Sequence, residues 1–434
     1  MNARLAFFLS SRMLRGRDGT ARYLRGSALG IALSLVPLIV VMEVSTGMIE
    51  GITVRLLEVG TYHIQVSLAS RLQLSDMQSR ARRIAAVPDV VAAVIERQGT
   101  GLLVTRTAAA AVSIRCVPSD IFDEDPGFSS NVTIRAGSSN LSQPELILVS
   151  VALAASLGLN VGDRVNLLTT FGENLSGAAR LTALTVGGVY ETGYQELDKT
   201  LVYGSLELAS KVLSPRGSRA LIGVKVKDPF ADLGSVTEAV SRAAGSNARV
   251  ATWREIEYPR MESFRTTKAL LLFIMALIVA VASVNVSSSV LMVVFERRNE
   301  IGILKSVGVE ERSLSLSFLL TGLATGLLGT ACGIAAGLLI SVNINGVIAG
   351  LEWSVNKVLE VISLLRSAFQ PSSHALGAFT VFNSAYYLKS IPIRIDVGEV
   401  LAAAAATLLL CVFASWLPAR QASRTKPLSI LRKV

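Results

Sequence analysis

Long apolar runs separated by charged segments dominate this chain and decide its class. Four runs have about 20 apolar residues, the length that a helix needs to cross a hydrocarbon core about 30 Å thick. We predict four membrane-spanning helices, over residues 27–48, 269–295, 314–342 and 397–417. The roughly 220 residues between the first two runs are long enough to form a core of their own. The pattern predicts a membrane protein with a large domain inserted between its first and second spans.

The first run is interrupted, because Pro37 lies inside it and Glu43 ends its continuous apolar part. A cleaved signal peptide is the alternative interpretation. However, the basic stretch before the run is long, with six arginines between residues 4 and 25, and no A-x-A cleavage pattern follows it. Proline is tolerated within spanning helices. We therefore expect an uncleaved span.

The inserted region, residues 49–268, has the pattern of a mixed α/β domain. Alternating or β-branched runs predict strands at 62–66, 90–95, 101–104 and 112–117, and a helical pattern covers 77–86. Residues 145–168, "ELILVSVALAASLGLNVGDRVNLL", predict a strand, a helix that ends at Gly158, and a turn into a further strand. Strand-then-helix patterns recur further along, and no solenoid repeat is visible.

The charge distribution indicates how the chain is oriented. The net charge is +10; residues 1–26 and 418–434 each carry a net charge of +5, so the remainder of the chain is neutral overall. Because Lys and Arg resist translocation, both tails and the segment 296–313 are expected in the cytoplasm. The domain 49–268 and the loop 343–396 are then expected outside. Basicity confined to the tails argues for this topology and against a nucleic-acid partner.

Residues 1–26 also contain an amphipathic pattern. Leu5, Phe8, Leu9 and Met13 lie at helical spacing, with Arg4 and Arg12 elsewhere around the helix. Such a helix can lie in the membrane interface, and a solvated leader is the alternative.

A short charged segment between the second and third spans, 296–313, has the pattern of an amphipathic helix. Ile301, Leu304 and Val307 form an apolar stripe, Arg297 and Glu300 can pair at i, i+3, and Gly308 is placed to end the helix. This pattern is typical of a docking element for a cytoplasmic partner. A helix that rests on lipid is the alternative.

The third span carries glycines at four-residue spacing, which let helix backbones approach closely. They are Gly322 and Gly326, followed by Gly329, Gly333 and Gly337. Packing inside one chain and a dimer contact both remain open. Asn285 in the second span can hydrogen-bond either across helices or within its own bundle.

The chain lacks the common signatures of catalysis. It has no G-x-x-x-x-G-K-[ST] loop for ATP and no G-x-S-x-G motif, and its two histidines have no second ligand at metal spacing. Cys116 is the one cysteine outside the spans, so the inserted domain cannot form an internal disulfide. Asp120, Asp123, Glu124 and Asp125 fit a solvated acidic turn that ends at Pro126. We predict no catalytic residue, no metal and no bound cofactor.

Two motifs resemble FtsX-like ABC transporter permeases. They are residues 297–339, "RRNEIGILKSVGVEERSLSLSFLLTGLATGLLGTACGIAAGLL", and the tail "WLPARQASRTKPLSILR". The resemblance implies that a coupling helix contacts a separate ABC ATPase dimer, which binds ATP and Mg. The residues that would form the coupling helix are Arg297, Arg298, Glu300, Ile301, Leu304, Lys305 and Gly308. The residues that carry the tail motif are Pro418, Ala419, Arg420 and Pro427.

Three further stretches resemble the lipoprotein-releasing LolC/LolE branch of that family. They are residues 41–66, the outer-domain stretches 157–168 and 184–213, and "YYLKSIPIRIDVGEVL" before the fourth span. The resemblance implies a MacB-like periplasmic domain in a multi-pass protein of the bacterial inner membrane. It also implies a second LolC/LolE-like permease, or a copy of this chain, as partner.

The same resemblance implies extraction of lipoproteins from the outer leaflet and their release to a periplasmic carrier. The candidate contacts with lipid or substrate are Met42, Val44, Met48, Phe264 and Leu271. Residues 169–181, where LolC-type subunits have a chaperone-binding hairpin, are short and lack proline, and 343–385 is longer than the family's usual loop. The alternatives are a MacB-like exporter of peptides or drugs and an FtsX-like signalling permease that regulates a cell-wall hydrolase.

Overall fold

A computed structural model describes residues 20–69, 73–171, 178–214, 218–245, 247–369 and 392–424. These residues divide into two compact units. The membrane bundle contains the described residues 20–48, 264–369 and 392–424. The α/β domain contains the described residues of Ile49–Ser263. Most of the predicted N-terminal segment and Pro427 lie outside the described residues.

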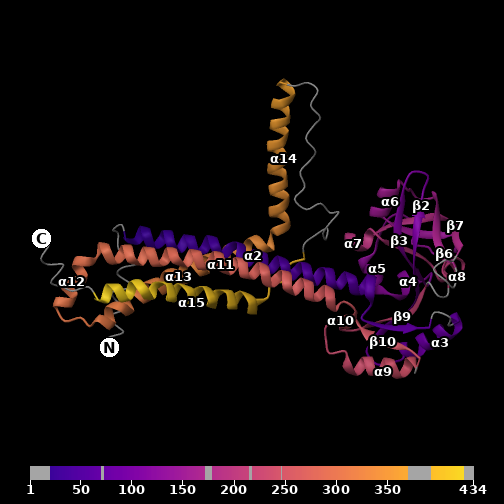
Figure 1. Cartoon of the computed structure of the whole chain (residues 1–434), viewed down its shortest axis with the longest axis horizontal. Coiled ribbons are helices and arrows are strands. Elements are labelled where there is room, and N and C mark those ends of the chain that lie inside the picture. Colours follow the sequence, from indigo (N-terminus) through magenta and orange to yellow (C-terminus); the bar gives the residue numbers. More distant parts are fainter. Residues whose placement is uncertain are drawn as a thin grey trace. The chain divides into compact units, whose positions relative to one another are not determined.

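Four helices of the described chain are long and apolar enough to span a membrane, which confirms the four predicted spans. They are α2 (Thr20–Arg55), α11 (Tyr258–Glu296), α13 (Glu311–Val342) and α15 (Val397–Arg424) (Figure 1). At 1.5 Å per residue, α2 and α11 are each over about 50 Å long and exceed the thickness of a bilayer. Both helices therefore continue beyond their apolar windows, and their far ends belong to the α/β domain.

The glycines of α13 all face neighbouring helices of the same bundle. A Cβ on Gly326 would lie 3.0 Å from the Cβ of Cys411 on α15, and one on Gly333 would lie 3.0 Å from the Cβ of Leu35 on α2. Gly322 likewise faces α15, and Gly329 and Gly337 face α2. Of the two interpretations left open by the sequence, these contacts support packing inside one chain. They also show that α2 packs closely against α13.

Two shorter helices complete the bundle unit. α12 (Arg298–Ser306) lies between α11 and α13, where the charged segment predicted a helix. α14 (Ile344–Phe369) occupies part of the stretch 343–396, for which the sequence analysis specified only a loop. Asn285 on α11 accepts a hydrogen bond through its main-chain oxygen from Ser27 Oγ at 3.3 Å, and its side chain is exposed.

The described α/β domain has one ten-stranded mixed sheet, with strands in the order β10-β1-β9-β2-β3-β8-β5-β7-β4 and β6 pairing with β2 and β7. Its strands are β1 (Ile64–Leu68), β2 (Val90–Val104), β3 (Ala109–Val117), β4 (Thr133–Gly137), β5 (Leu146–Ser150), β6 (Arg164–Phe171), β7 (Ala178–Glu191), β8 (Leu201–Ser205), β9 (Arg219–Val226) and β10 (Arg249–Thr252). β6 and β7 form a hairpin, and its tip, residues 172–177, lies outside the described residues.

The domain's short helices and turns follow the strands. They are η1 (Leu56–Thr61, a π-helix), α3 (Leu74–Ala85), α4 (Ile121–Glu124), α5 (Pro126–Asn131), α6 (Val151–Leu157), α7 (Gln195–Asp198), α8 (Leu206–Val212), α9 (Gly234–Ala244) and α10 (Trp253–Ile256). The mixed α/β prediction is confirmed. The two strands predicted at 90–95 and 101–104 are one strand, β2, because its polar middle pairs successively with β9 and β3.

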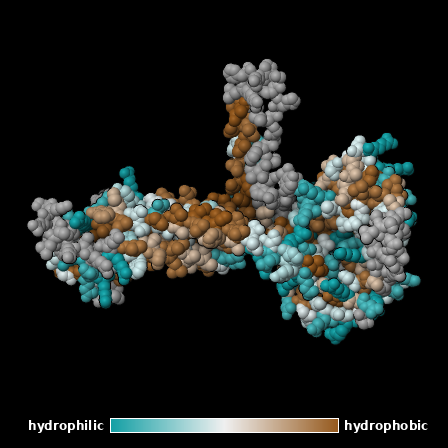
Figure 2. Space-filling model, viewed as in Figure 1, coloured by the Kyte–Doolittle hydropathy of each residue, from teal (hydrophilic) through white to brown (hydrophobic). Residues whose placement is uncertain are grey.

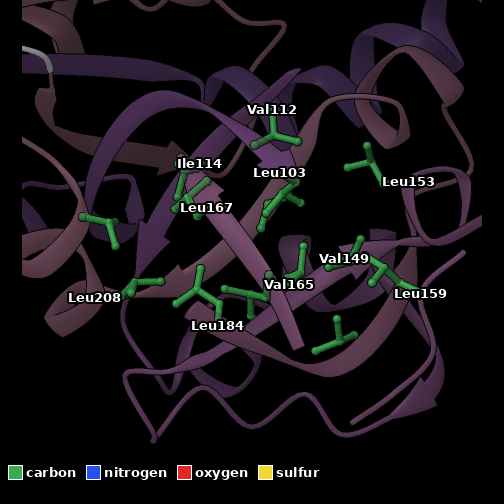
Figure 3. Packing of buried hydrophobic residues seen from close by; sticks show 14 of the residues in the cluster. Leu103, Val112, Ile114, Val149, Leu153, Leu159, Val165, Leu167, Leu184 and Leu208 are labelled. Carbon is green, nitrogen blue, oxygen red and sulfur yellow. The ribbon is translucent and has the colours of Figure 1, made fainter. Parts of the chain in front are cut away.

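Two strands run directly into helices through serine caps. Ser150 Oγ accepts from Leu153 N at 3.1 Å to begin α6, and Ser205 Oγ accepts from Leu208 N at 3.2 Å to begin α8. As predicted, Gly158 ends α6 in the left-handed conformation, with φ of 66°. Apolar side chains from β2, β3, β5 to β8, α6 and α8 meet in one buried cluster, shown in Figure 3. This cluster gives the domain the core that its length predicted.

The glycine contacts of α13 predict a position-specific effect on stability. Gly333→Leu forces a side chain against the backbone of α2 and should lower the free energy of unfolding by about 1–3 kcal/mol or more. Gly346→Leu on α14 is the matched control, because no described atom lies within 4 Å of a Cβ there. Thermal unfolding of both full-length variants in detergent tests the difference. Equal midpoints would contradict the packing described for α13.

Candidate functional site

α12 ends in a Schellman motif that fixes its geometry. Val309 N donates to Leu304 O at 3.1 Å and Gly308 N donates to Lys305 O at 3.0 Å. Gly308 has φ of 97°, a conformation that costs glycine little, which confirms its predicted role as the end of the helix. The predicted pair of Arg297 Nη1 and Glu300 Oε2 is also present, at 3.1 Å. The sequence therefore sets both ends of α12 locally.

The predicted apolar stripe of α12 faces two directions. Ile301 is 2% exposed and packs with Leu314, Phe318 and Ala419 of the bundle, and Leu304 is partly buried against the same cluster. Lys305 turns toward α13, where its Nζ lies 2.9 Å from Glu311 Oε1. Ile301, Leu304 and Lys305 therefore hold the helix on the bundle.

The side of α12 that is open to a partner is formed by other residues. Ile303 is 58% exposed and Val307 is 80% exposed, so both apolar side chains point away from the bundle. The remaining exposed residues of this docking surface are Arg298, Asn299 and Glu300. The sequence analysis missed Ile303. Residue spacing identifies an apolar face of a helix, but it does not show whether that face packs on the bundle or on a partner protein.

The tail motif packs beside α12. Ala419 is fully buried in the cluster that contains Ile301, and Pro418 lies within α15. The Arg420 guanidinium lies over the Trp416 ring, 4.3 Å from its centroid. The motif that resembled the family's closing pattern therefore supports the base of the docking surface.

The end of α2 that lies in the α/β domain is held by buried cations. Helix α2 continues into η1, where the carbonyl oxygen of Glu58 accepts from Lys225 Nζ at 2.9 Å. The carbonyl oxygen of Val59 accepts from Arg115 Nη1 and from Tyr203 OH. These contacts satisfy two carbonyls of the last turn and attach the helix end to β3, β8 and β9. We call this arrangement the helix anchor.

Each cation of the helix anchor has carboxylate partners. Arg115 forms a two-fold contact with Glu96, and both side chains are buried. Burial by itself lowers the pKa of Arg115, but the Glu96 carboxylate raises it well above its usual value, so the pair remains ionised. Lys225 Nζ lies 2.6 Å from Glu58 Oε2 and 2.7 Å from Asp125 Oδ1. The prediction of a solvated turn is therefore wrong for Asp125, which is fully buried against Lys225. Pairing of this kind is what allows a charge to be buried.

Tyr62, the residue after η1, completes the helix anchor. Its φ of 65° is unusual for a bulky residue, and its OH donates to Glu96 Oε2 at 2.8 Å. A Cβ on Gly223 would lie 2.3 Å from the Tyr62 ring, so this glycine leaves the space that the ring occupies. Burial, and then the Glu96 charge, raise the pKa of Tyr62 well above its usual value, so its hydroxyl remains a hydrogen-bond donor.

A second attachment in the domain joins α2 and α11 to the same loop, residues 192–198. Arg55 Nε donates to the carbonyl oxygen of Thr192 at 3.0 Å, and Arg260 Nη1 lies 2.8 Å from Glu196 Oε2. Thr61 Oγ1 donates to Glu257 Oε1 at 2.7 Å, which links the two chain entries directly. Both long helices therefore contact the same segment of the domain, residues 192–198, which ends in α7.

Sequence analysis did not find these attachments. Their members lie far apart in the sequence, because Glu58 and Lys225 are 167 positions apart. The available signal was a charged residue inside an apolar strand pattern, as with Arg115 in "AVSIRCV" and Lys225 in "LIGVKV". Such residues are buried only when they are paired.

The lipid-contact candidates differ in their surroundings. Met42 is buried among Leu38, Ile39 and Val279 inside the bundle. Val44, Met48, Phe264 and Leu271 are half-buried. A longer exposed apolar face runs along α11 and includes Leu270, Phe273, Leu277, Val281 and Val284. Figure 2 shows apolar side chains over much of the bundle surface (Figure 2).

A polar group links three helices within the bundle. Lys268 Nζ on α11 lies 2.6 Å from Glu399 Oε1 on α15 and donates to Thr46 Oγ1 on α2 at 2.8 Å. Glu43 on α2 is buried and accepts from Asp396 N at 3.3 Å. Charged groups at such positions require partners. Lys268 and Glu399 provide them for each other, whereas Glu43 Oε1 is buried without a hydrogen-bond partner among the described residues. Among the described residues, no group of three His, Cys, Asp or Glu side chains is arranged to hold a metal ion.

The C-terminal part of the chain matches a known family model. Residues 272–427, which include α12, α13 and α15, match the family model described as FtsX-like permease C-terminal. The resemblance to FtsX-like permeases seen in the sequence is thereby confirmed. The part of the chain that carries α12 is therefore similar to the C-terminal domain of FtsX-like permeases.

Several relatives match nearly the whole chain and carry more specific names than the family model. The chain is 27% identical to the "Lipoprotein-releasing system transmembrane protein LolC" of Neisseria meningitidis, over 94% of this chain and 93% of the relative. It is 26% identical to LolC of Xylella fastidiosa (99% and 98% covered) and 23% identical to LolE of Haemophilus influenzae (98% of each). The periplasmic region of MacB from Actinobacillus actinomycetemcomitans gives a TM-score of 0.30 at 14% identity, covering 48% of this chain and 95% of that one.

The helix anchor predicts a large and specific loss of stability. Arg115→Met leaves Glu96 buried without its cation and should lower the free energy of unfolding by roughly 3–5 kcal/mol. Adding Glu96→Gln should restore part of that loss, because no unpaired charge remains. Arg135→Met breaks an exposed pair with Glu191 and should cost only about 0–1 kcal/mol. Thermal unfolding of the full-length variants compares them; equal losses for Arg115 and Arg135 would refute the anchor.

Proposed function

We propose that this chain is the permease subunit of an ABC transporter that extracts lipoproteins from the outer leaflet of the bacterial inner membrane. The observation that carries the proposal is the similarity to LolC and LolE over nearly the whole chain, together with an FtsX-like permease domain that contains α12. The chain itself hydrolyses no ATP. A separate ABC ATPase dimer binds ATP and Mg and supplies the energy.

The proposed orientation follows from the charge pattern. Both termini and α12 lie in the cytoplasm, because the excess Lys and Arg of the chain lie in its two tails. The α/β domain then lies in the periplasm. This places the docking surface on the side where ATP is available and the domain on the side where lipoproteins are released.

In this proposal the docking surface of α12 seats in the ATPase. Ile303 and Val307 supply the apolar contact, and Arg298 and Glu300 supply the polar rim. Ile301, Leu304 and Lys305 join α12 to α13 and to the rest of the bundle, so displacement of the surface moves the helices. The helix anchor and residues 192–198 hold the domain ends of α2 and α11 within the α/β domain.

The substrate explains why ATP is required. Removing acyl chains from a bilayer costs about 0.8 kcal/mol per CH₂, so two or three long chains require tens of kcal/mol. An apolar route lowers that cost, and the exposed face of α11 with Met48, Phe264 and Leu271 is the candidate. Met42 supports this route by packing inside the bundle. A second LolC/LolE-like permease or a copy of this chain faces it, and a periplasmic carrier receives the lipoprotein.

Reconstitution with the co-purifying ATPase, in proteoliposomes that contain a triacylated lipoprotein, tests the proposal. We expect ATP to release the lipoprotein to a soluble carrier, and Ile303→Glu to abolish release while leaving the thermal midpoint unchanged. Ile301→Glu is the matched variant: it should lower the midpoint itself, because it buries a carboxylate in the bundle.

ATP hydrolysis without release, in the presence of a competent carrier, would contradict lipoprotein extraction and favour an exporter or a signalling permease. Release that survives Ile303→Glu in a folded protein would contradict the assigned docking surface.

A further inference from the structure

Helix α14 carries a broad apolar face that no part of the described chain covers. Its side chains are described as far as Ile362, and apolar residues recur at alternating spacings of four and three. They are Ile344, Ile348, Leu351, Val355, Val358 and Ile362. Leu351 is 53% exposed and Val358 is 58% exposed. The other side carries the polar residues Asn345, Glu352, Asn356 and Glu360, together with Trp353, which is 65% exposed.

The start of α14 is fixed at the end of a membrane-spanning helix. Only Asn343 separates it from α13; Asn343 N donates to Leu339 O at 3.3 Å, and Val347 N donates to Asn343 O at 2.8 Å. The turn is therefore hydrogen-bonded on both sides. α14 begins where α13 leaves the hydrocarbon, and it runs across the direction of α13 rather than along it (Figure 1).

The apolar face of α14 is turned toward the bundle side. Ile344 is 9% exposed, so the side of α14 that carries Ile344 faces the bundle at the start of the helix. Ile362 comes 18 residues later, which is five complete turns at 3.6 residues per turn, so it lies on the same side. Figure 2 likewise shows apolar side chains along this side of α14. A helix that crosses the end of a spanning helix and turns an apolar face back toward it faces the lipid around the bundle.

We propose that α14 lies in the headgroup region of the bilayer, with its apolar face inserted by about 5–10 Å. The width of that face supports lipid over a second copy of the chain. Val347, Leu359 and Val361 widen the apolar face on both sides of the six residues at alternating spacing. A two-stranded coiled coil needs only a narrow stripe of that spacing. This inference concerns the membrane surface and holds whether or not the chain releases lipoproteins.

Nitroxide labels on the full-length protein test the placement. The three native cysteines are replaced, and single labels are introduced at Leu351 and Val358 on the apolar face and at Glu352 and Asn356 on the polar face. The protein is reconstituted in vesicles of phosphatidylethanolamine and phosphatidylglycerol. Collision with oxygen, which partitions into lipid, is compared with collision with a water-soluble nickel chelate.

We expect oxygen to dominate at Leu351 and Val358 and the nickel chelate to dominate at Glu352 and Asn356, so that the contrast changes sign between neighbouring residues. Low access to both reagents at Leu351 and Val358 would show that protein, such as a second copy, covers the face, and would overturn the proposal. Dominant nickel access at all four positions would show a solvated helix and would also overturn it.

As a second measurement, the variant Leu351→Glu/Val358→Glu should shift a label at Ile362 from oxygen access toward nickel access. Asn356→Glu is the matched control and should leave that label unchanged. A label at Ile362 that responds equally to both variants would contradict lipid contact through the apolar face.

Discussion

The structure depends on how a long helix ends inside a folded domain. At η1 the carbonyl oxygens of Glu58 and Val59 are held by Lys225 and Arg115, whose charges are neutralised by buried carboxylates. Buried charges of this kind contribute little net stability, but the loss of one partner is costly. The helix end therefore has one favourable position in the domain. A connection of that kind transmits displacement, whereas a flexible loop would absorb it.

The membrane bundle uses a different constraint. Lipid provides no hydrophobic drive between helices, so close packing through small residues holds them together. The glycines of α13 bring α2 and α15 to contact distance on two sides. Helix α11, in contrast, leaves a long apolar face open, from Leu270 to Val284. The described bundle therefore has a closely packed centre and exposes apolar side chains around its outside, on α11 and also on α2, α13 and α15.

Much of this architecture could be predicted from local pattern. The four spans, the caps at Gly158 and Gly308 and the Arg297–Glu300 pair depend on residues close together in sequence. Features that depend on distant partners could not be predicted in this way. The spacing of Ile301 and Leu304 indicated a docking stripe, although both side chains pack inward and Ile303 points outward. Lys225 and Glu58 meet only because the sheet brings them together. The resemblance supplied the functional class, and α14 was missed because the region was treated only as a loop.

The central claim of the proposed function is that the residues of α2 and α11 that belong to the α/β domain stay attached to its sheet and to residues 192–198 throughout the ATPase cycle. Spin labels at Thr200, beside the 192–198 loop, and at Ser263, on α11, measure the attachment directly through their dipolar distance in the assembled complex. The account predicts one narrow distance distribution that is the same without nucleotide, with ATP under turnover and in a trapped hydrolysis state. A distribution that shifts or broadens between these states would show that the domain swings on its helices, and would contradict the account.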